Sequence, residues 1–276
     1  HKITTRWFIL PVASMAIIST VLATNIFYYF VIEPSMSHIP SVFSVTLFLF
    51  LWLRDYGVKS YQSYIVLGLS SALMVMIRHQ NGLFMILPLL EMIDVGTRQN
   101  FGAKRILRLV SQGVLYLGAA VLAFLPQFLV WKVLYGQFVA FAYRAGAGGS
   151  AFDFAHPVVL QVLFSSRHGL ITWTPILLLA LLGFGWFIKD HLKMGLFLLV
   201  ALLLQLYLIA SWHTWAAGSS FGARYLTNCT PVFVIGLAAF INRFWDHRLY
   251  LYSSFLVLSC WNLLFIGQYA FHLVPM

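Results

Sequence analysis

The feature that most constrains this chain is a series of long apolar runs that carry no charge. The run at 194–210, MGLFLLVALLLQLYLIA, contains no Asp, Glu, Lys or Arg, and similar runs recur along the sequence. Hydrophobic residues make up 61% of the chain and charged residues 9%, against roughly 45–50% and about 25% in soluble domains. A soluble core cannot bury that much apolar surface, so we expect lipid to be the main solvent.

The apolar runs predict an all-α, polytopic transmembrane bundle that forms a single domain over residues 1–276. A helix of about 20 residues crosses a hydrocarbon core of about 30 Å. On this basis we expect about nine spans, at 7–30, 39–53, 61–77, 82–95, 109–131, 170–188, 194–210, 225–242 and 249–268.

The basic residues divide unequally between the two sides of such a bundle. Of the 17 Lys and Arg residues, twelve fall on one side, and the others are Arg78, Lys132, Arg144, Arg167 and Arg224. The positive-inside rule places the more basic side in the cytoplasm. The N-terminus is then cytoplasmic, and the short basic loops on that side are interpreted as solvated orientation signals.

The first residue and the two cysteines bear on processing of the chain and on disulfide or metal binding. Residue 1 is His and no cleavable signal peptide is visible, so we expect a fragment of a longer protein or a trimmed chain. Cys229 and Cys260 both lie in apolar runs, which gives no disulfide or metal pattern. The sequence predicts no cofactor, and it leaves open whether a divalent metal takes part.

Polar residues gather on the predicted outer side. The run 82–95 has 14 residues, or about 21 Å as a helix, which is shorter than the membrane core. One interpretation is that the turn RHQN, with Arg78, Gln80 and Asn81, lies within the bundle as a functional site. The other is that Arg78 reaches the lipid headgroups.

A long outer segment, 132–169, exceeds the length of a simple connector. Val158, Val159, Val162 and Leu163 have helical spacing, which predicts an amphipathic helix over 157–164 lying along the membrane interface. We expect the segment to form a partly helical cover. It is followed by Arg167 and His168, which stand beside a glycine and are candidate site residues.

The stretch SWHTWAAGSSFGARY, residues 211–225, combines aromatic, glycine, serine and arginine residues between two apolar runs. Trp212 and Trp215 are suited to stacking on a sugar or an apolar chain. Gly218 and Gly222 allow close approach of the backbone, and Arg224 offers a fork of donors for a phosphate. Together they predict a site for a phosphorylated, lipid-attached ligand.

Four segments resemble bacterial integral-membrane glycosyltransferases of the GT-C superfamily, which includes protein O-mannosyltransferases and the lipid A aminoarabinose transferase. They are YYFVIEPSMSHIPSVFSVTLFLFLWLR, GLSSALMVMIRHQNGLFMILPLLE, LFSSRHGLITWTPILLLALLG and WHTWAAGSSFGARYLTNCTPVFVIGLA. The resemblance implies transfer of a sugar from a polyprenyl-phosphate donor to an envelope glycan, lipid or protein acceptor at the outer face. It also implies residence in the bacterial inner membrane and a carboxylate base in a first external loop upstream of residue 1, so we expect the chain alone to be inactive.

The chemistry of such a transfer assigns roles to the outer residues. Cations are needed to bind the donor phosphate, and the candidates are Arg78, Arg167 and Arg224. The outer acids, Glu33 and Asp153, are not expected to be the base. The residues predicted to bind substrate are Glu33, His38, Gln80, Asn81, His168, Trp212, Trp215, Gly218, Ser219 and Tyr225.

Two other functions fit parts of the same pattern. A transporter or flippase for lipid-linked saccharides or other anions would also use outer arginines and a membrane-sunk turn, but the sequence has no inverted repeat and no matched pair of broken helices. A structural subunit would leave the arginine and glycines of 211–225 without a role. The transferase is therefore the first hypothesis and the transporter is the second.

Overall fold

A computed structural model describes residues 1–97, 102–140, 152–218 and 220–274. These residues form twelve α-helices and four short 3₁₀ helices, with no β-strand among them, which confirms the all-α prediction. The chain divides into two compact units. Unit 1 comprises His1–Val42 and Phe152–Met276, and unit 2 comprises Phe43–Ala151.

Four helical segments within the described residues are long and apolar enough to cross a membrane: Lys104–Tyr135, Leu192–Ala210, Arg224–Arg243 and Trp245–Ala270. Three shorter apolar helices, Leu10–Leu22, His38–Arg54 and Tyr61–Ile77, accompany them. Nine separate spans are therefore not supported. The expected spans 7–30, 82–95 and 170–188 are not continuous α-helices. Each is divided into two shorter helical segments.

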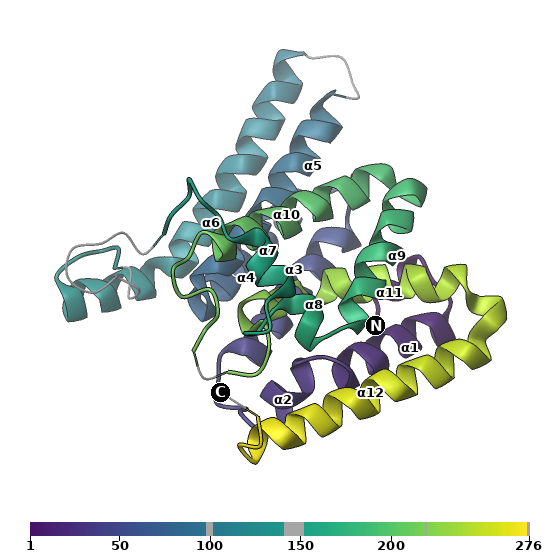
Figure 1. Ribbon diagram of the computed structural model, residues 1–276. Coiled ribbons are helices and arrows are strands. Elements are labelled where there is room, and N and C mark those ends of the chain that lie inside the picture. The colour runs from purple at the N-terminus through teal and green to yellow at the C-terminus, as the bar shows by residue number, and fades with distance from the viewer. Residues whose placement is uncertain (98–101, 141–151, 219, 275–276) are drawn as a thin grey trace. The chain divides into compact units, whose positions relative to one another are not determined.

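Unit 1 is organised around α11. Its helices, shown in Figure 1, are α1 (Leu10–Leu22), α2 (Ile26–Val31), the first turn of α3 (His38–Arg54), α7 (Val159–Phe164), α8 (Leu170–Trp173), α9 (Ile176–Asp190), α10 (Leu192–Ala210), α11 (Thr230–Arg243) and α12 (Arg248–Ala270). The segment Arg224–Arg243, which ends in α11, buries 83% of its most apolar stretch, against 28% for Trp245–Ala270. α11 therefore forms the centre of the unit, with α1 and α9 packed against it.

Small residues bring α9 and α11 into close contact. A Cβ atom added to Gly183 would overlap the carbonyl oxygen of Gly236, and one added to Gly236 would overlap the carbonyl oxygen of Ala180. Close backbone approach through small residues is typical of helix pairs in membranes, where apolar burial gives little net drive. These two glycines fix how closely the helices pack.

The break between α1 and α2 is stabilised by a side chain from α12. Asn262 donates from Nδ2 to the carbonyl oxygens of Leu22 and Thr24, at 2.9 Å each. A helix that ends inside a bundle leaves carbonyls without partners, and lipid supplies no replacement donors. This single amide therefore allows the chain to turn at 23–25, where the sequence predicted one continuous span.

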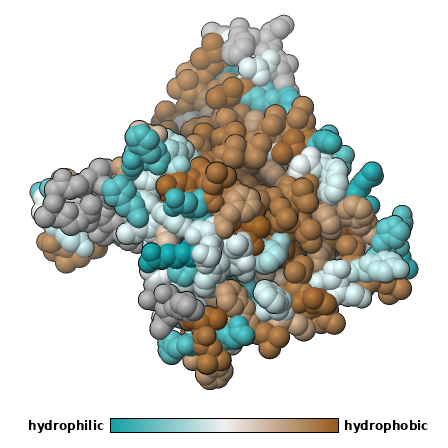
Figure 2. All heavy atoms as spheres, in the orientation of Figure 1, coloured by the Kyte–Doolittle hydropathy of each residue, from teal (hydrophilic) through white to brown (hydrophobic). Residues whose placement is uncertain are grey.

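Unit 2 contains the remainder of α3, then α4 (Tyr61–Ile77), a 3₁₀ helix His79–Met85, α5 (Ile86–Thr97) and α6 (Ala103–Tyr135). α4 packs closely on α6, because a Cβ on Gly68 would overlap the carbonyl oxygen of Tyr116. Only 17% of the most apolar stretch of α6 is buried within the described chain. Much of the visible surface in Figure 2 is likewise apolar, as expected for a protein whose solvent is lipid.

A buried ion pair in unit 2 corrects one interpretation of the sequence. Lys59 was expected in a solvated cytoplasmic loop, but its Nζ atom donates to both carboxylate oxygens of Glu91, at 2.8 and 2.6 Å. The backbone N–H of Gly57 also donates to this carboxylate, at 2.6 Å. The Lys59 and Glu91 side chains are only 1% and 2% exposed, so the loop is attached to α5 by buried charge.

A helix is present in the range expected at 157–164: α7 begins two residues later, at Val159, and its position along a membrane interface stays a prediction. Val162 is buried, while Leu160 and Phe164 on other sides of the helix are exposed. α7 packs against α8 and α10 within unit 1. Residues 141–151 of the expected cover lie outside the described residues.

Candidate functional site

The segment that links α10 to α11 folds as an ordered loop, with backbone turns at its glycines. Gly218 and Gly222 have φ values of 59° and 64°, in the left-handed region that favours glycine. At Gly222 the space is open enough for a Cβ, since the nearest atoms belong to Asn25 and Trp173 at 3.6 and 3.7 Å. The glycine is therefore required by the backbone turn rather than by crowding. Ser219 lies outside the described residues.

A second loop, which joins α7 to α8, is attached to the first one through His168. The Nδ1 atom of His168 lies 2.5 Å from the carbonyl oxygen of Ala216. His168 is buried and has a φ of 68°, and Ala217, beside its partner, has a φ of 65°. Non-glycine residues rarely adopt this conformation, and it persists where the surroundings impose it. The two loops thus hold each other in a strained arrangement.

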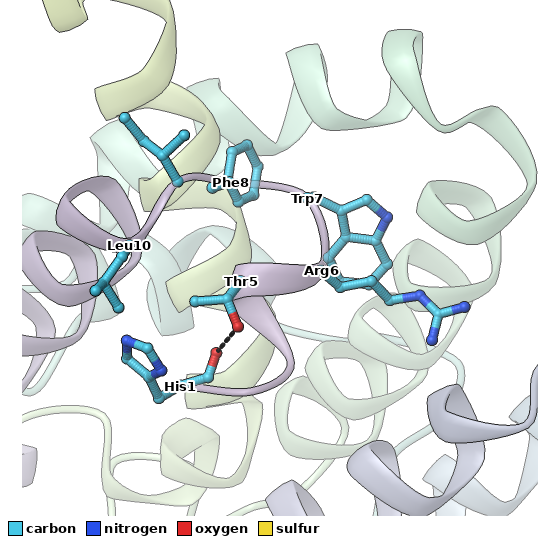
Figure 3. Close-up of a pocket in the computed structure, with 7 residues that line it drawn as sticks. His1, Thr5, Arg6, Trp7, Phe8 and Leu10 are labelled. Carbon is cyan, nitrogen blue, oxygen red and sulfur yellow. Dashed lines mark hydrogen bonds between the residues drawn. The ribbon is translucent and has the colours of Figure 1, made fainter.

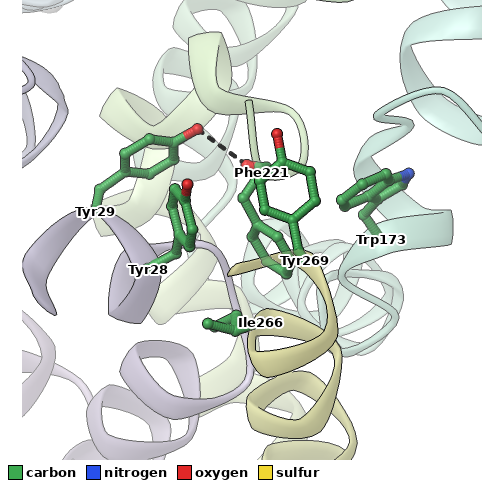
Figure 4. Packing of buried hydrophobic residues seen from close by; sticks show 6 residues of the cluster. All are labelled: Tyr28, Tyr29, Trp173, Phe221, Ile266 and Tyr269. Carbon is green, nitrogen blue, oxygen red and sulfur yellow. Dashed lines mark hydrogen bonds between the residues drawn. The ribbon is translucent and has the colours of Figure 1, made fainter. Parts of the chain in front are cut away.

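Five aromatic side chains from four parts of unit 1 form the inner wall of the site. In Figure 4 the rings of Tyr28, Phe221 and Tyr269 lie together between Tyr29 and Trp173. Tyr28 stacks on Phe221 at 5.2 Å, and the Tyr29 hydroxyl donates to the Phe221 carbonyl oxygen at 3.1 Å. These contacts connect α2, α8 and α12 to the loop that carries Arg224.

Arg224 lies at the end of this loop with its charge only partly satisfied. Its Nε atom is buried and has no hydrogen-bond partner among the described residues. Within the described ranges, the guanidinium makes one hydrogen bond, from a terminal nitrogen to the Tyr225 hydroxyl at 3.5 Å, and it also lies 5.3 Å from the centre of that ring. Neither Arg224 nor Arg167 forms an ion pair with an acid in the described part of the chain.

Glu33 is the acid of this site. Its Oε1 accepts a hydrogen bond from the Tyr28 hydroxyl at 3.1 Å, and its backbone N–H donates to the Tyr28 carbonyl at 3.1 Å. Its Oε2 is buried and has no partner among the described residues. The charges of Glu33 and Arg224 both act on the phenols of Tyr29 and Tyr269, so a carboxylate and a guanidinium lie beside the same aromatic wall.

The imidazole of His168 is influenced by the positive charges of two arginines, Arg167 and Arg224. Burial is the main cause that lowers the His168 pKa, and the positive charges of Arg167 and Arg224 lower it further, while the bond to Ala216 raises it. Arg167 is exposed and Arg224 is half-buried. Three of the residues that the sequence predicted, Arg167, His168 and Arg224, therefore interact electrostatically.

His38 and Trp212 also join this region. His38 is buried, packs on the Tyr29 ring at 4.3 Å and lies 3.4 Å from Thr227 Oγ1. Trp212 packs on Tyr225 at 4.6 Å. Trp215 and Gly218 belong to the same loop, where the Trp215 N–H donates to the Trp212 carbonyl oxygen at 3.1 Å and Gly218 is exposed.

An aromatic row extends from Tyr225 to the segment that precedes α7. Trp212 stacks on Phe152 at 6.2 Å, and Phe152 stacks on Phe154 at 5.5 Å. Phe152 and Trp212 also form an isolated antiparallel β-bridge. The rings thus provide an apolar surface that leads to the guanidinium of Arg224.

The predicted residues of the RHQN turn belong to unit 2. Arg78 donates to Gln80 Oε1 at 3.4 Å, and the buried Asn81 donates from Nδ2 to the Met74 carbonyl oxygen at 2.9 Å. Asn81 is therefore enclosed by protein within unit 2, and the segment His79–Met85 that contains it is a 3₁₀ helix. Convergence of Arg78 with Arg167 and Arg224 stays a prediction.

Asp153, the other outer acid, is engaged in local contacts. Its carboxylate lies 3.1 Å from His156 Nδ1 and accepts bonds from the N–H groups of Ala155 and His156. The hydrogen bond from His156 is the main cause that lowers the Asp153 pKa. An acid held ionised at the surface is a poor proton acceptor, so Asp153 does not meet the requirements of a general base.

Several contributors to the site were missing from the sequence-based set, including Tyr28, Tyr29, Trp173, Phe221, Tyr269 and Ser220. Tyr28, Ser220 and Tyr269 carry no motif that would mark them. Ser220 is fully buried, and its Oγ has no hydrogen-bond partner among the described residues. The one available signal was that Ser220 lies between Gly218 and Gly222 in a loop already identified as a candidate.

The hollows of unit 1 lie outside this cluster. An open depression at the N-terminal segment is lined by His1, Thr5, Arg6, Trp7, Phe8, Ile9 and Leu10 (Figure 3). A smaller cavity of about 10 Å³, the space of one water molecule, is lined by Thr20, Thr24, Asn25, Leu170, Leu177, Ala223, Leu226, Thr227, Thr230 and Phe233. No group of three His, Cys, Asp or Glu residues able to hold a metal occurs in the described ranges.

Comparison with protein-family models, with curated proteins and with solved structures finds no match to this chain. The chemical interpretation of the site therefore depends on its own geometry.

Proposed function

We propose that the chain is the donor-binding part of a membrane glycosyltransferase that uses a polyprenyl-phosphate sugar at the outer face. The observation that carries the proposal is Arg224, whose buried Nε has no partner while the rest of the guanidinium contacts Tyr225. A buried cationic donor without a partner is costly. A bound phosphate would satisfy it with charge-assisted hydrogen bonds.

The neighbouring groups favour a phosphate attached to an apolar chain. Arg167 adds a second positive charge near His168, and Ser220 adds a buried hydroxyl that lacks a partner. The row formed by Tyr225, Trp212 and Phe152 supplies an apolar surface beside the guanidinium. A free inorganic anion would use the cations alone, whereas a lipid phosphate would use both features.

The cations would also contribute to transfer. When the bond between the anomeric carbon and the phosphate oxygen breaks, the electron pair stays on the phosphate, where Arg224 and Arg167 would stabilise the added charge. The acceptor oxygen forms the new bond to the anomeric carbon and gives its proton to a base. The described residues supply no clear base, so the proposal for this chain is limited to donor binding.

The test is binding of farnesyl phosphate, a short polyprenyl phosphate, to the chain in lipid nanodiscs. We expect Arg224→Lys to weaken binding about tenfold or more, because the point charge remains but the fork of donors is lost. Arg248→Lys, at an exposed arginine that begins α12, is the matched control and should leave affinity unchanged. Equal affinity of the wild type and Arg224→Lys would overturn the assignment.

A further inference from the structure

Glu33 presents a combination that the binding of phosphate does not explain. One carboxylate oxygen is held by the Tyr28 hydroxyl at 3.1 Å, and the other is buried without a partner. A carboxylate oxygen in this state lacks the hydrogen bonds that water would give it, which costs about 1–3 kcal/mol or more for a charged group. The Glu33 carboxylate therefore has one oxygen without a hydrogen bond in the free protein.

The groups around Glu33 limit which donor can form a hydrogen bond with its Oε2 atom. Arg224 acts on the same tyrosines but forms no ion pair with Glu33, and no other described cation does so. Tyr28 holds Glu33 at two points, since its hydroxyl donates to the carboxylate and its carbonyl oxygen accepts from the Glu33 backbone N–H. Both Glu33 and Arg224 are only partly buried as whole residues, so part of each one reaches the surface of unit 1.

We infer that Glu33, positioned by Tyr28, is the sugar-binding residue of the donor site and selects a sugar that carries free hydroxyl groups and no acid group. The inference rests on the proposed function, because it takes the phosphate to be held by Arg224. A carboxylate accepts hydrogen bonds from sugar hydroxyls, whose O–H groups are donors. Tyr28, Phe221 and Tyr269 are buried against one another, so they hold Glu33 in place while its carboxylate meets the sugar.

The sign of the Glu33 charge sets the specificity. A neutral hexose offers only hydroxyl donors to Oε2, whereas a uronic acid brings a second carboxylate into the same half-buried space. Two like charges at short range in a poorly solvated site repel each other. A glucuronosyl donor should therefore lack the binding free energy that a glucosyl donor gains from its hydrogen bond to Glu33.

The experiment compares three ligands on one preparation of the full chain in nanodiscs: farnesyl phosphate, its glucosyl ester and its glucuronosyl ester. We expect the wild type to bind the glucosyl ester about tenfold more tightly than the glucuronosyl ester, the size of one hydrogen bond to a charged group. Because both affinities come from the same sample, their ratio does not depend on the folded fraction of a variant.

Glu33→Gln keeps the shape of the side chain and removes its charge. In this variant the preference for the glucosyl ester over the glucuronosyl ester should fall to about twofold or less, while farnesyl phosphate still binds at least as tightly as to the wild type, because the removed charge is negative. Tyr28→Phe keeps the ring but frees Oε1, and should reduce the preference by a smaller factor. Asp153→Asn, at the acid bound to His156, is the matched control and should keep the full preference.

The outcomes separate the two proposals. If the wild type binds farnesyl phosphate and Arg224→Lys weakens that binding, but Glu33→Gln keeps the full glucosyl preference, the role of Glu33 is refuted and the donor site stands. If the wild type binds none of the three ligands, the donor site itself is refuted. Equal binding of the two sugar esters by the wild type also overturns the selection of neutral sugars.

Discussion

Glu91 in unit 2 and Glu33 in unit 1 are both acids with buried oxygens, but their partners differ. The Glu91 carboxylate accepts two hydrogen bonds from Lys59 and one from the Gly57 N–H. Glu33 accepts one hydrogen bond from Tyr28 and leaves Oε2 without a partner. Unit 2 thus satisfies its buried acid internally, and unit 1 does not.

This difference separates charges that hold the fold from charges that are available to a ligand. Buried ionisable groups in a membrane protein are costly, and most of them pair with one another or mark a site. The Lys59–Glu91 pair is an example of the first kind. Arg224 and Glu33, each with an unsatisfied atom near one aromatic wall, are examples of the second.

The largest expected effect is the loss of stability when the buried Lys59–Glu91 pair is broken. Lys59→Ala should lower the free energy of unfolding by about 3–5 kcal/mol, because it leaves the Glu91 carboxylate buried without its counter-ion. Unfolding in detergent, followed by circular dichroism over a denaturant series, measures this loss. The double variant Lys59→Met with Glu91→Leu should recover most of it, since an apolar pair can replace a buried ion pair. A loss below about 1 kcal/mol in Lys59→Ala would show that the pair is solvated.

The next effect tests whether unit 1 has a rigid frame behind its site. Gly183→Ala should destabilise the protein by about 1–3 kcal/mol, because the added methyl group meets the backbone of α11. Gly185→Ala is the matched control on the same helix, since a Cβ there meets nothing within 4 Å. That control should be neutral or slightly stabilising, as alanine favours helix. The same loss in both variants would contradict the close packing of α9 on α11.

The unpaired cation should behave in the opposite way to Lys59. Arg224→Met removes a guanidinium whose Nε has no partner, so the free energy of unfolding should stay unchanged or rise by about 1 kcal/mol. The same variant should lose binding of farnesyl phosphate. Denaturant unfolding and ligand binding, measured on one preparation, give both results. A destabilisation as large as that of Lys59→Ala would place Arg224 with the structural charges.

The sequence predicted helices well where a run has no charge and no internal break. The expected range 61–77 coincides with α4, and 194–210 differs from α10 by two residues at its start. The break at 23–25 was not predicted, because its carbonyls are satisfied by Asn262, about 240 residues away along the chain. Such a contact exists only after folding, and a local pattern cannot show it.

The candidate site was predicted in part for the same reason. Arg167, His168 and Arg224 were identified from their local composition, and the charges of both arginines act on the His168 imidazole. The contact between Tyr29 and the Phe221 carbonyl joins residues 192 positions apart, so no local motif marks it. Tyr28 and Tyr269 likewise gain their roles only through packing.

The smallest expected effect is the pH dependence that His168 contributes to unit 1. Its folded-state pKa lies below the ordinary value of 6.5 because of burial and the nearby Arg167 and Arg224. Above pH 6.5 the imidazole is neutral in both states and causes no loss. As the pH falls from 6.5 toward the folded-state pKa, the unfolded chain binds the proton first, so stability declines. His168→Asn, which tolerates the left-handed backbone and keeps a donor for Ala216, should flatten this decline. Farnesyl phosphate should also flatten it in the wild type, since a bound anion offsets the two arginines. Unfolding measured at a series of pH values checks both, and an unchanged slope in His168→Asn would remove His168 from the charge cluster.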